Sequence, residues 1–188
     1  MKTLSSEKFS RRGTTLEAAA SRIRIVAMDI DGVLSNGYIG YTGDSGEEIK
    51  MFNVRDGAGL ANLRRCGYII GCITGRRSHA NEVRAAELKL DFLVQATFSK
   101  TEALMEIAVQ HGLTLEDCLF VGDDLIDGHT LMNCGIGVAV GDASEAILPC
   151  ADVQTQANGG HGAVREMAEW LMKINGHWEN VLQRYRIQ

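Results

Sequence analysis

The sequence predicts an α/β fold, a doubly wound parallel sheet of Rossmann-like type with helices on both faces. Short apolar runs lack polar alternation, which is typical of strands buried on both faces of a parallel sheet. These runs alternate with segments of helical periodicity, as in successive βαβ units. Polar residues gather where several of the runs end, and the end of a strand is where open α/β sheets bind ligands.

Each predicted strand and helix follows from a local pattern. The predicted strands are IRIVAMDI (23–30), YIIGCIT (68–74), DFLVQ (91–95), CLFVG (118–122) and IGVAV (136–140). The predicted helices are 56–66, 78–89, 100–111, 124–133 and, after the last strand, 162–175. Gly67 and Gly112 stand where a glycine commonly ends a helix, which supports the boundaries of two of them.

The segment between the first two strands departs from this alternation. In GYIGYTGDSGEEIKMFNV, two β-prone runs flank a Gly/Asp/Ser cluster, which predicts a β-hairpin projection. The hairpin is too small to be a cap domain. We therefore expect one domain over 23–176, preceded by a flexible N-terminal arm (1–22) and followed by a C-terminal tail (177–188).

Composition narrows the class of protein. A chain of 188 residues with 45% apolar and 23% charged residues is typical of a globular domain. Its net charge of −5 argues against a nucleic-acid partner. Five scattered cysteines without a C-x-x-C pair argue against a disulfide framework or a zinc site. The chain shows no signal-peptide core and no run of about 20 apolar residues, so cytoplasmic residence and no membrane partner are expected.

Chemically active residues follow four segments of the predicted sheet. Asp29 and Asp31 end the first strand, and Thr74 ends the second. Lys100 begins the helix after the third strand, and VGDDLID (121–127) closes the fourth. Because parallel strands end at the same edge, we expect carboxylates, a hydroxyl and an ammonium group to share one rim.

This pattern predicts phosphoryl-transfer chemistry with a magnesium ion. Asp29, Asp31, Asp123 and Asp124 repel one another too strongly to gather near the core without a cation, and a small oxygen-ligand set suits Mg²⁺. A metal and a lysine offset the charge of a phosphoryl group. An aspartate can attack phosphorus, and a second carboxylate can transfer protons.

The motifs DIDGVLSNG, ITGR, Lys100 and GDDLID, in this order, resemble the four motifs of the haloacid dehalogenase superfamily of aspartate-nucleophile phosphatases. The resemblance covers Arg24 to Asp152. A second, closer resemblance extends to about residue 175. It rests on the segments SGEEIKMFNVRDGAGL, ITGRRS, GDDLID and GGHGAVRE. These segments look like those of the capless members that hydrolyse 3-deoxy-D-manno-octulosonate 8-phosphate for lipopolysaccharide synthesis. The resemblance implies a homotetramer with active sites at subunit interfaces.

The resemblance also implies a role for individual residues. Asp29 would be the nucleophile and Asp31 the general acid/base, while Thr74 and Lys100 would hold the phosphoryl group. The implied metal ligands are Asp29, Asp31 through its backbone carbonyl, and Asp123, with Asp124 and Asp127 in supporting positions. The implied substrate-binding residues are Asn53, Val54, Arg55, Asp56, Gly57, Arg76, Arg84 and Lys100.

Two alternatives remain open at this stage. Asn36, Ala61 and His161 depart from the residues common in relatives, so a nine-carbon sialic-acid-type 9-phosphate is a rival substrate. A phospho-acceptor signalling domain is a different class with a similar set of residues. It would place an aspartate at the end of the third strand, where this chain has LVQATFS.

Overall fold

The computed structural model describes residues 1–4, 9 and 13–187. Within them, the central sheet has the order β1 (Lys2–Thr3), β9 (Val153–Gln154), β8 (Ile136–Ala139), β7 (Cys118–Gly122), β2 (Ile25–Met28), β5 (Ile69–Ile73) and β6 (Phe92–Val94). Among the described strands of this sheet, only the pairing of β1 with β9 is antiparallel. The parallel sheet and the five predicted strands are confirmed. The two-residue strands β1 and β9 were missed because so short a run carries no periodicity.

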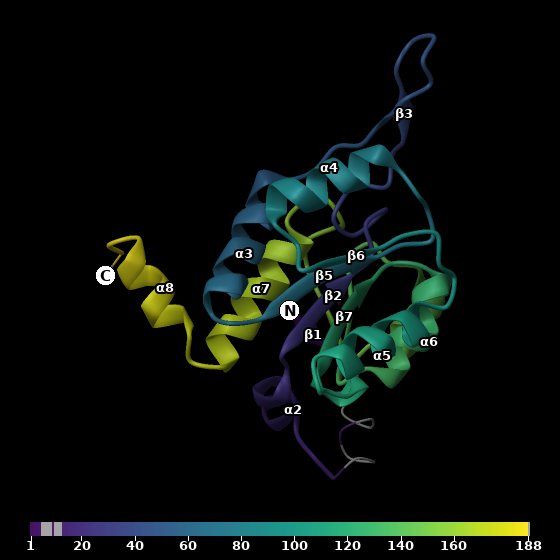
Figure 1. Ribbon diagram of the computed structural model, residues 1–188. Coiled ribbons are helices and arrows are strands. Elements are labelled where there is room, and N and C mark those ends of the chain that lie inside the picture. The colour runs from purple at the N-terminus through teal and green to yellow at the C-terminus, as the bar shows by residue number, and fades with distance from the viewer. Residues whose placement is uncertain (5–8, 10–12, 188) are drawn as a thin grey trace.

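Helices cover both faces of the sheet, as predicted (Figure 1). One face carries α3 (Val54–Arg65), α4 (His79–Leu88) and α7 (Ala163–Ile174), and the other carries α5 (Lys100–Gln110) and α6 (Gly128–Asn133). Short 3₁₀ turns precede β7, α6 and β9 at η1 (Leu115–Asp117), η2 (Leu125–Asp127) and η3 (Glu145–Cys150). The helix predicted at 124–133 therefore begins later. No helix in the described ranges has the length and apolar character to cross a membrane.

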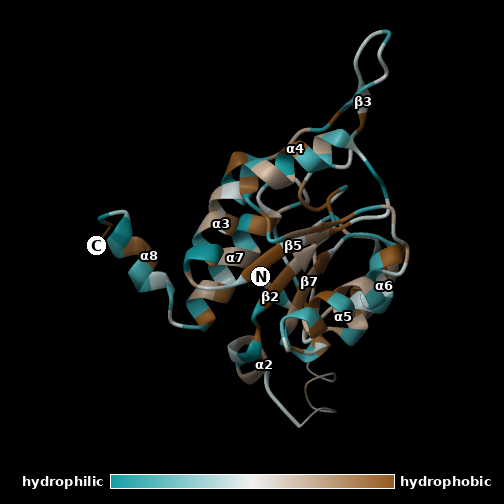
Figure 2. Ribbon diagram, in the orientation of Figure 1, coloured by the Kyte–Doolittle hydropathy of each residue, from teal (hydrophilic) through white to brown (hydrophobic). Residues whose placement is uncertain are grey.

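The strands in the middle of the sheet form the core. Every residue of β2 and β7 is buried, and Figure 2 shows these strands as predominantly hydrophobic between helices of mixed character. Strand β2 lies between β5 and β7, with Met28 opposite Cys72 on one side and Val121 on the other. The residues that follow β2 therefore emerge at the centre of the sheet edge.

The predicted hairpin is present and projects from the domain (Figure 1). Strands β3 (Gly40–Tyr41) and β4 (Glu48–Ile49) pair with each other and not with the main sheet. A single antiparallel bridge between Ser35 and Phe52 closes its base. Between β2 and β5 the described chain thus contains this hairpin and α3, and no cap domain.

The N-terminal segment contains a helix and a strand that the sequence did not predict. Residues Leu16–Arg22 form helix α2, whose Ala19 and Ala20 are buried, and β1 pairs with β9. These parts of 1–22 pack on the domain because their apolar residues reach its core, while the flexibility of the arm stays a prediction. Residues 5–8 and 10–12 lie outside the described part of the chain.

The C-terminal tail also contains a helix, α8 (Trp178–Arg184). Val181 is buried, and the Tyr185 hydroxyl donates to Asn62 Oδ1 of α3 at 3.2 Å. Residue 188 is not among the described residues. The domain boundaries at 23 and 176 stay a prediction.

Candidate active site

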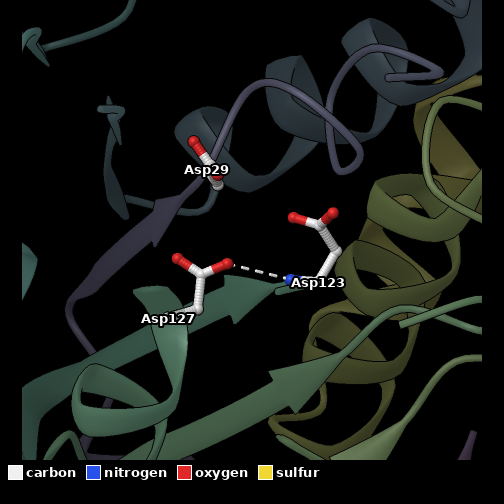
Figure 3. Close-up of side chains that lie close together, drawn as sticks. All are labelled: Asp29, Asp123 and Asp127. Carbon is white, nitrogen blue, oxygen red and sulfur yellow. Dashed lines mark hydrogen bonds between the residues drawn. The ribbon is translucent and has the colours of Figure 1, made fainter. Parts of the chain in front are cut away.

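Three aspartates converge at the edge of the sheet where β2 and β7 end (Figure 3). Asp29 directly follows β2, and Asp123 and Asp127 follow β7. One carboxylate oxygen from each lies within 4.8 Å of the other two. Asp29 and Asp127 are buried, and Asp123 Oδ1 is a buried oxygen that accepts no hydrogen bond from the described residues.

The electrostatics of this group favour a bound cation. Burial, followed by the charges of Asp127 and Asp29, raises the pKa of Asp123 to about 8. Burial also raises the pKa of Asp29 to about 6, although Lys100 opposes the shift. Without a cation Asp123 thus resists ionisation at neutral pH, and Asp29 ionises at a higher pH than an ordinary aspartate. A set of oxygen donors with one unsatisfied buried oxygen fits a hard divalent ion such as Mg²⁺.

Glycine lets the two acidic loops approach each other. Gly32 has φ +89, and a Cβ at this position would lie 2.1 Å from Asp123 Oδ2. A Cβ on Gly122 would lie 2.5 Å from the Cβ of Asp127. Larger residues would therefore displace the carboxylates, which explains why glycine accompanies both acidic motifs.

Asp127 fixes the loop that carries Asp123. Its Oδ2 accepts a hydrogen bond from the backbone nitrogen of Asp123 at 3.0 Å (Figure 3). The same oxygen also accepts one from the backbone nitrogen of Asp124 at 3.3 Å. The Asp124 side chain is exposed and accepts from Leu125 N at 2.8 Å, so it caps η2. The predicted acidic cluster is therefore corrected: Asp124 points outward as a helix cap, and Asp127 takes its place in the cluster.

Lys100 forms ion pairs with two of the three aspartates. Its Nζ lies 2.8 Å from Asp29 Oδ2 and 2.6 Å from Asp127 Oδ1, and its side chain has no exposed area. Burial lowers the pKa of Lys100, but the charges of Asp29 and Asp127 outweigh it and leave the pKa above its usual value. The first residue of α5 thus supplies a permanent positive charge beside Asp29.

Asp31 lies outside the group of three aspartates, and its cationic partner is Lys50 and not Lys100. Lys50 Nζ contacts both of its carboxylate oxygens, at 2.7 Å and 2.8 Å, and Ser35 Oγ lies 3.4 Å from Oδ1. Sequence reasoning gave Lys50 no role, because lysine is rarely buried and nothing in the local pattern marks this one. The predicted contact of the Asp31 backbone carbonyl with a metal stays a prediction.

Thr74 and Arg76 follow β5 on the same edge of the sheet. The Thr74 side chain is buried, and its Oγ1 accepts a hydrogen bond from Arg76 N at 3.3 Å. Arg76 is half exposed, forms an ion pair with Glu48 of the hairpin, and has its Nε 3.9 Å from Asp31 Oδ2. Glu48 thus engages one guanidinium nitrogen of Arg76 and leaves other donors for a ligand.

The NVRDG segment begins α3, and its residues lie in different environments. Asn53 caps the helix by accepting from Arg55 N at 2.9 Å, and the side chains of Val54 and Arg55 are exposed. Asp56 is fully buried and accepts from the backbone nitrogen of Arg165, at the start of α7, at 2.7 Å. The prediction that Asp56 contacts substrate is corrected, because a carboxylate enclosed between two helices cannot reach a ligand.

Arg84 is buried beneath the start of α3. It donates to Glu87 at 2.7 Å and to the Asn53 carbonyl at 3.4 Å, and its guanidinium lies 5.3 Å from the centre of the Phe52 ring. A Cβ on Gly57 would lie 3.0 Å from Arg84, so this buried glycine makes room for it. Arg84 also lines a groove of about 430 Å³ between the hairpin and α4.

Known proteins with similar sequences place this chain in a family. A model of haloacid dehalogenase-like hydrolases matches residues 76–167. The 3-deoxy-D-manno-octulosonate 8-phosphate phosphatase KdsC of Escherichia coli K12 is 40% identical over 159 residues, which is 85% of this chain and 84% of that protein. This chain belongs to the KdsC phosphatase family. The family lies within the haloacid dehalogenase-like hydrolases, which confirms the resemblance seen in the motifs.

Solved structures of KdsC phosphatases share the fold. The 3-deoxy-D-manno-octulosonate 8-phosphate phosphatase of Moraxella catarrhalis, in complex with magnesium ion, phosphate ion and KDO, is 35% identical. Its TM-score is 0.87, with 90% of this chain and 97% of that chain covered. The cobalt-bound enzyme of Haemophilus influenzae is 32% identical with a TM-score of 0.81, and 85% of this chain and 93% of that chain are covered.

The raised pKa values predict how Mg²⁺ affects stability. The raised pKa values mean that Asp29 and Asp123 contribute to the stability of the folded state when protonated. This contribution is fully present below their ordinary pKa of 3.8. It is lost as the pH rises through about 6 for Asp29 and about 8 for Asp123. A cation must displace these protons, so its affinity rises over the same range. We expect Mg²⁺ to raise the melting temperature little near about pH 5.5 and substantially near about pH 8.5. Scanning fluorimetry with and without Mg²⁺ measures this, and equal shifts at both pH values contradict it.

Proposed function

We propose that this chain is a Mg²⁺-dependent phosphomonoesterase that converts 3-deoxy-D-manno-octulosonate 8-phosphate to Kdo and phosphate in lipopolysaccharide biosynthesis. The observation that carries the proposal is the convergence of Asp29, Asp123 and Asp127, with Lys100 paired to Asp29. The identity of 40% to a KdsC phosphatase supports the same reaction. The residue roles below are part of the proposal.

In the first half-reaction, Asp29 is the nucleophile. Its Oδ1 accepts from Ile30 N at 2.7 Å and its Oδ2 is paired with Lys100, so the carboxylate is held in one orientation. One oxygen attacks phosphorus, the bond from phosphorus to the sugar oxygen breaks, and Asp31 gives its proton to the departing alkoxide. Lys100 offsets the charge on the phosphoryl oxygens, and the Thr74 hydroxyl donates a hydrogen bond to one of them.

In the second half-reaction, the now ionised Asp31 accepts a proton from water. The oxygen of that water attacks phosphorus, the acyl phosphate bond to Asp29 breaks, and inorganic phosphate and a free Asp29 carboxylate are formed. Asp31 regains the proton that it gave away. The Asp31 carboxyl group therefore donates a proton in the first half-reaction and accepts one in the second. Both proton transfers depend on its position.

The residues around Asp29 suit a magnesium ion. The carboxylates of Asp29 and Asp123, together with the Asp31 carbonyl, would hold it, and Asp127 would orient the loop that carries Asp123. When bound, the ion neutralises the acids and withdraws charge from the phosphoryl oxygens. The buried oxygen of Asp123 that lacks a hydrogen bond supports this assignment.

For the sugar acid, we propose that Arg55 binds the carboxylate. Arg55 is exposed at the start of α3, and a guanidinium group grips a carboxylate with two hydrogen bonds. Asn53, Val54, Arg76 and Arg84 form the rest of the proposed substrate site. Arg76 and Arg84 are already paired with Glu48 and Glu87, and each keeps further guanidinium donors for a ligand.

A substrate panel tests the proposed function. We expect Mg²⁺-dependent release of many equivalents of phosphate from 3-deoxy-D-manno-octulosonate 8-phosphate, with a higher kcat/KM than for a nine-carbon sialic-acid-type 9-phosphate or for simple hexose phosphates. A higher kcat/KM for the nine-carbon ester would instead assign the rival substrate. Phosphorylation that stops after one equivalent would indicate a phospho-acceptor domain and contradict the proposal.

We expect Arg55→Ala to lower kcat/KM for the sugar-acid phosphate by about 10²-fold, the effect of losing a charge-assisted hydrogen-bonded pair. The kcat/KM for p-nitrophenyl phosphate, which has no carboxylate, should change little. Steady-state kinetics with both substrates checks this, with Arg65→Ala at the far end of the same helix as the matched control. Equal losses for both substrates would show that Arg55 does not recognise the carboxylate.

We propose that the chain forms a homotetramer whose active sites lie at subunit interfaces. Large apolar side chains exposed beside the site support this, among them Tyr38 (77% exposed), Val54 (79%) and Phe98 (80%). Light scattering gives the oligomeric state, and a monomer with full activity contradicts the proposal. As part of the same proposal, the small-molecule partner is a sugar-acid phosphate. Neither a nucleic acid nor a membrane is involved, and the protein resides in the cytoplasm.

A further inference from the structure

Lys50 is a buried lysine with no part in the reaction described so far. It directly follows strand β4 of the hairpin, and its side chain has no exposed area. Its Nζ lies 2.7 Å and 2.8 Å from the two carboxylate oxygens of Asp31. Burying an ammonium group is costly, so a lysine in this position requires close anionic and polar partners.

The interior partners of Lys50 form a connected network. Asn81 Oδ1, on α4, accepts from Lys50 Nζ at 2.9 Å. Asn81 Nδ2 donates to Gln95 Oε1 at 3.1 Å, and the same oxygen accepts from Ser78 N at 3.0 Å. Lys50 is therefore held from the core side as well as by Asp31.

The other side chains around Asp31 hold its carboxylate less tightly than Lys50 does. Ser35 Oγ lies 3.4 Å from Oδ1, at the outer limit of a hydrogen bond. Arg76 Nε lies 3.9 Å from Oδ2, and Arg76 is already paired with Glu48. Lys50 thus makes the only close contacts to the Asp31 carboxylate among the described residues.

We propose that Lys50 is a positioning residue that holds the Asp31 carboxylate in place for both proton transfers. Lys50 Nζ is held between Asp31 and Asn81, so it acts on the reaction through Asp31. This inference rests on the proposed function, in which Asp31 protonates the leaving alkoxide and then deprotonates water. An unrestrained carboxylate on the same backbone would spend part of its time in rotamers that cannot serve either step.

The experiment replaces Lys50 by Met, which has a similar length and no charge. With p-nitrophenyl phosphate the leaving group needs no proton, so phosphorylation of Asp29 stays fast while hydrolysis of the phosphoenzyme slows. We expect a burst of one equivalent of p-nitrophenol and a mass gain of roughly 80 daltons, the mass of one PO₃ group, in intact-protein mass spectrometry. With the sugar-acid phosphate, whose alkoxide needs a proton, kcat should fall by about 10²-fold, the lower end of general acid–base effects.

Reference variants separate this role from a structural one. Asp31→Asn should show the same burst and mass gain, and Glu47→Gln, an exposed change in the same hairpin, should show neither. Lys50→Gln keeps a donor for Asn81, so it serves if Lys50→Met does not fold. Bound Mg²⁺, measured by titration calorimetry, should be unchanged in the folded Lys50 variant.

The outcomes distinguish the inference from the proposed function. A folded Lys50 variant with no burst, no mass gain and equal losses for both substrates overturns the positioning role. Wild-type protein that releases no phosphate from either substrate with Mg²⁺ overturns the proposed function itself. Accumulation of the phosphoenzyme in both Lys50→Gln and Asp31→Asn supports the inference.

Discussion

Replacing Asp29 by Asn is expected to lower kcat for phosphate release by about 10⁴-fold or more, the size of effect seen when a catalytic nucleophile is removed. The amide has the shape of the carboxylate, and its oxygen can still accept from Ile30 N, so the fold should persist. It cannot form the acyl phosphate, because the neutral amide is a poor nucleophile. Phosphate release from the sugar-acid phosphate with saturating Mg²⁺ measures the loss.

Two comparisons make this result specific. Asp44→Asn, an exposed change in the hairpin loop, should leave kcat unchanged. Circular dichroism of Asp29→Asn should match that of the wild type. Retained turnover in a folded Asp29→Asn protein would mean that another residue, or water, attacks phosphorus.

Replacing Lys100 by Met is expected to cost about 3–5 kcal/mol in the free energy of unfolding of the metal-free protein, as when one partner of a buried ion pair is removed. Lys100 Nζ is within 2.8 Å of Asp29 Oδ2 and 2.6 Å of Asp127 Oδ1, and its side chain is fully enclosed. Without it, Asp127 keeps backbone donors but no cationic partner among the described residues. Urea unfolding in the presence of a chelator at neutral pH measures the change.

Lys173→Met is the matched control. Lys173 is 52% exposed and contacts Glu169 at 3.3 Å, and an exposed ion pair contributes at most about 1 kcal/mol. Added Mg²⁺ should restore part of the lost stability of Lys100→Met, since the ion also neutralises Asp29. A Lys100→Met protein as stable as the control variant would contradict the electrostatic role given to this lysine.

Local sequence patterns were sufficient for the architecture. The runs at 25–28, 69–73 and 118–122 are apolar throughout, as is typical of strands buried on both faces of a parallel sheet. The residues that end these strands then had to share one edge, whatever the details of packing. Asp29 and Asp123 could be placed together on this ground, and the structure brings their carboxylates within 4.8 Å.

The sequence did not reveal which acids face each other. Asp124 and Asp127 are three residues apart in one motif, yet Asp124 points to solvent and Asp127 into the core. The difference arises from the 3₁₀ turn η2, which Asp124 caps and which turns Asp127 back toward the loop. Such a short turn carries no periodic signal, so the choice appears only in the three-dimensional structure.

The sequence by itself determined the strands, the helices that cover them and the edge at which the reactive residues meet, because these follow from hydrophobic periodicity and parallel topology. Only the tertiary structure decided the partners of the charged groups: Lys50 with Asp31, Lys100 with Asp29 and Asp127, and Asp56 with the start of α7. The contacting residues are between 19 and 109 positions apart in three of these contacts, Lys50–Asp31, Lys100–Asp127 and Asp56–Arg165. Each such contact depends on packing between distant elements, and no local pattern records it.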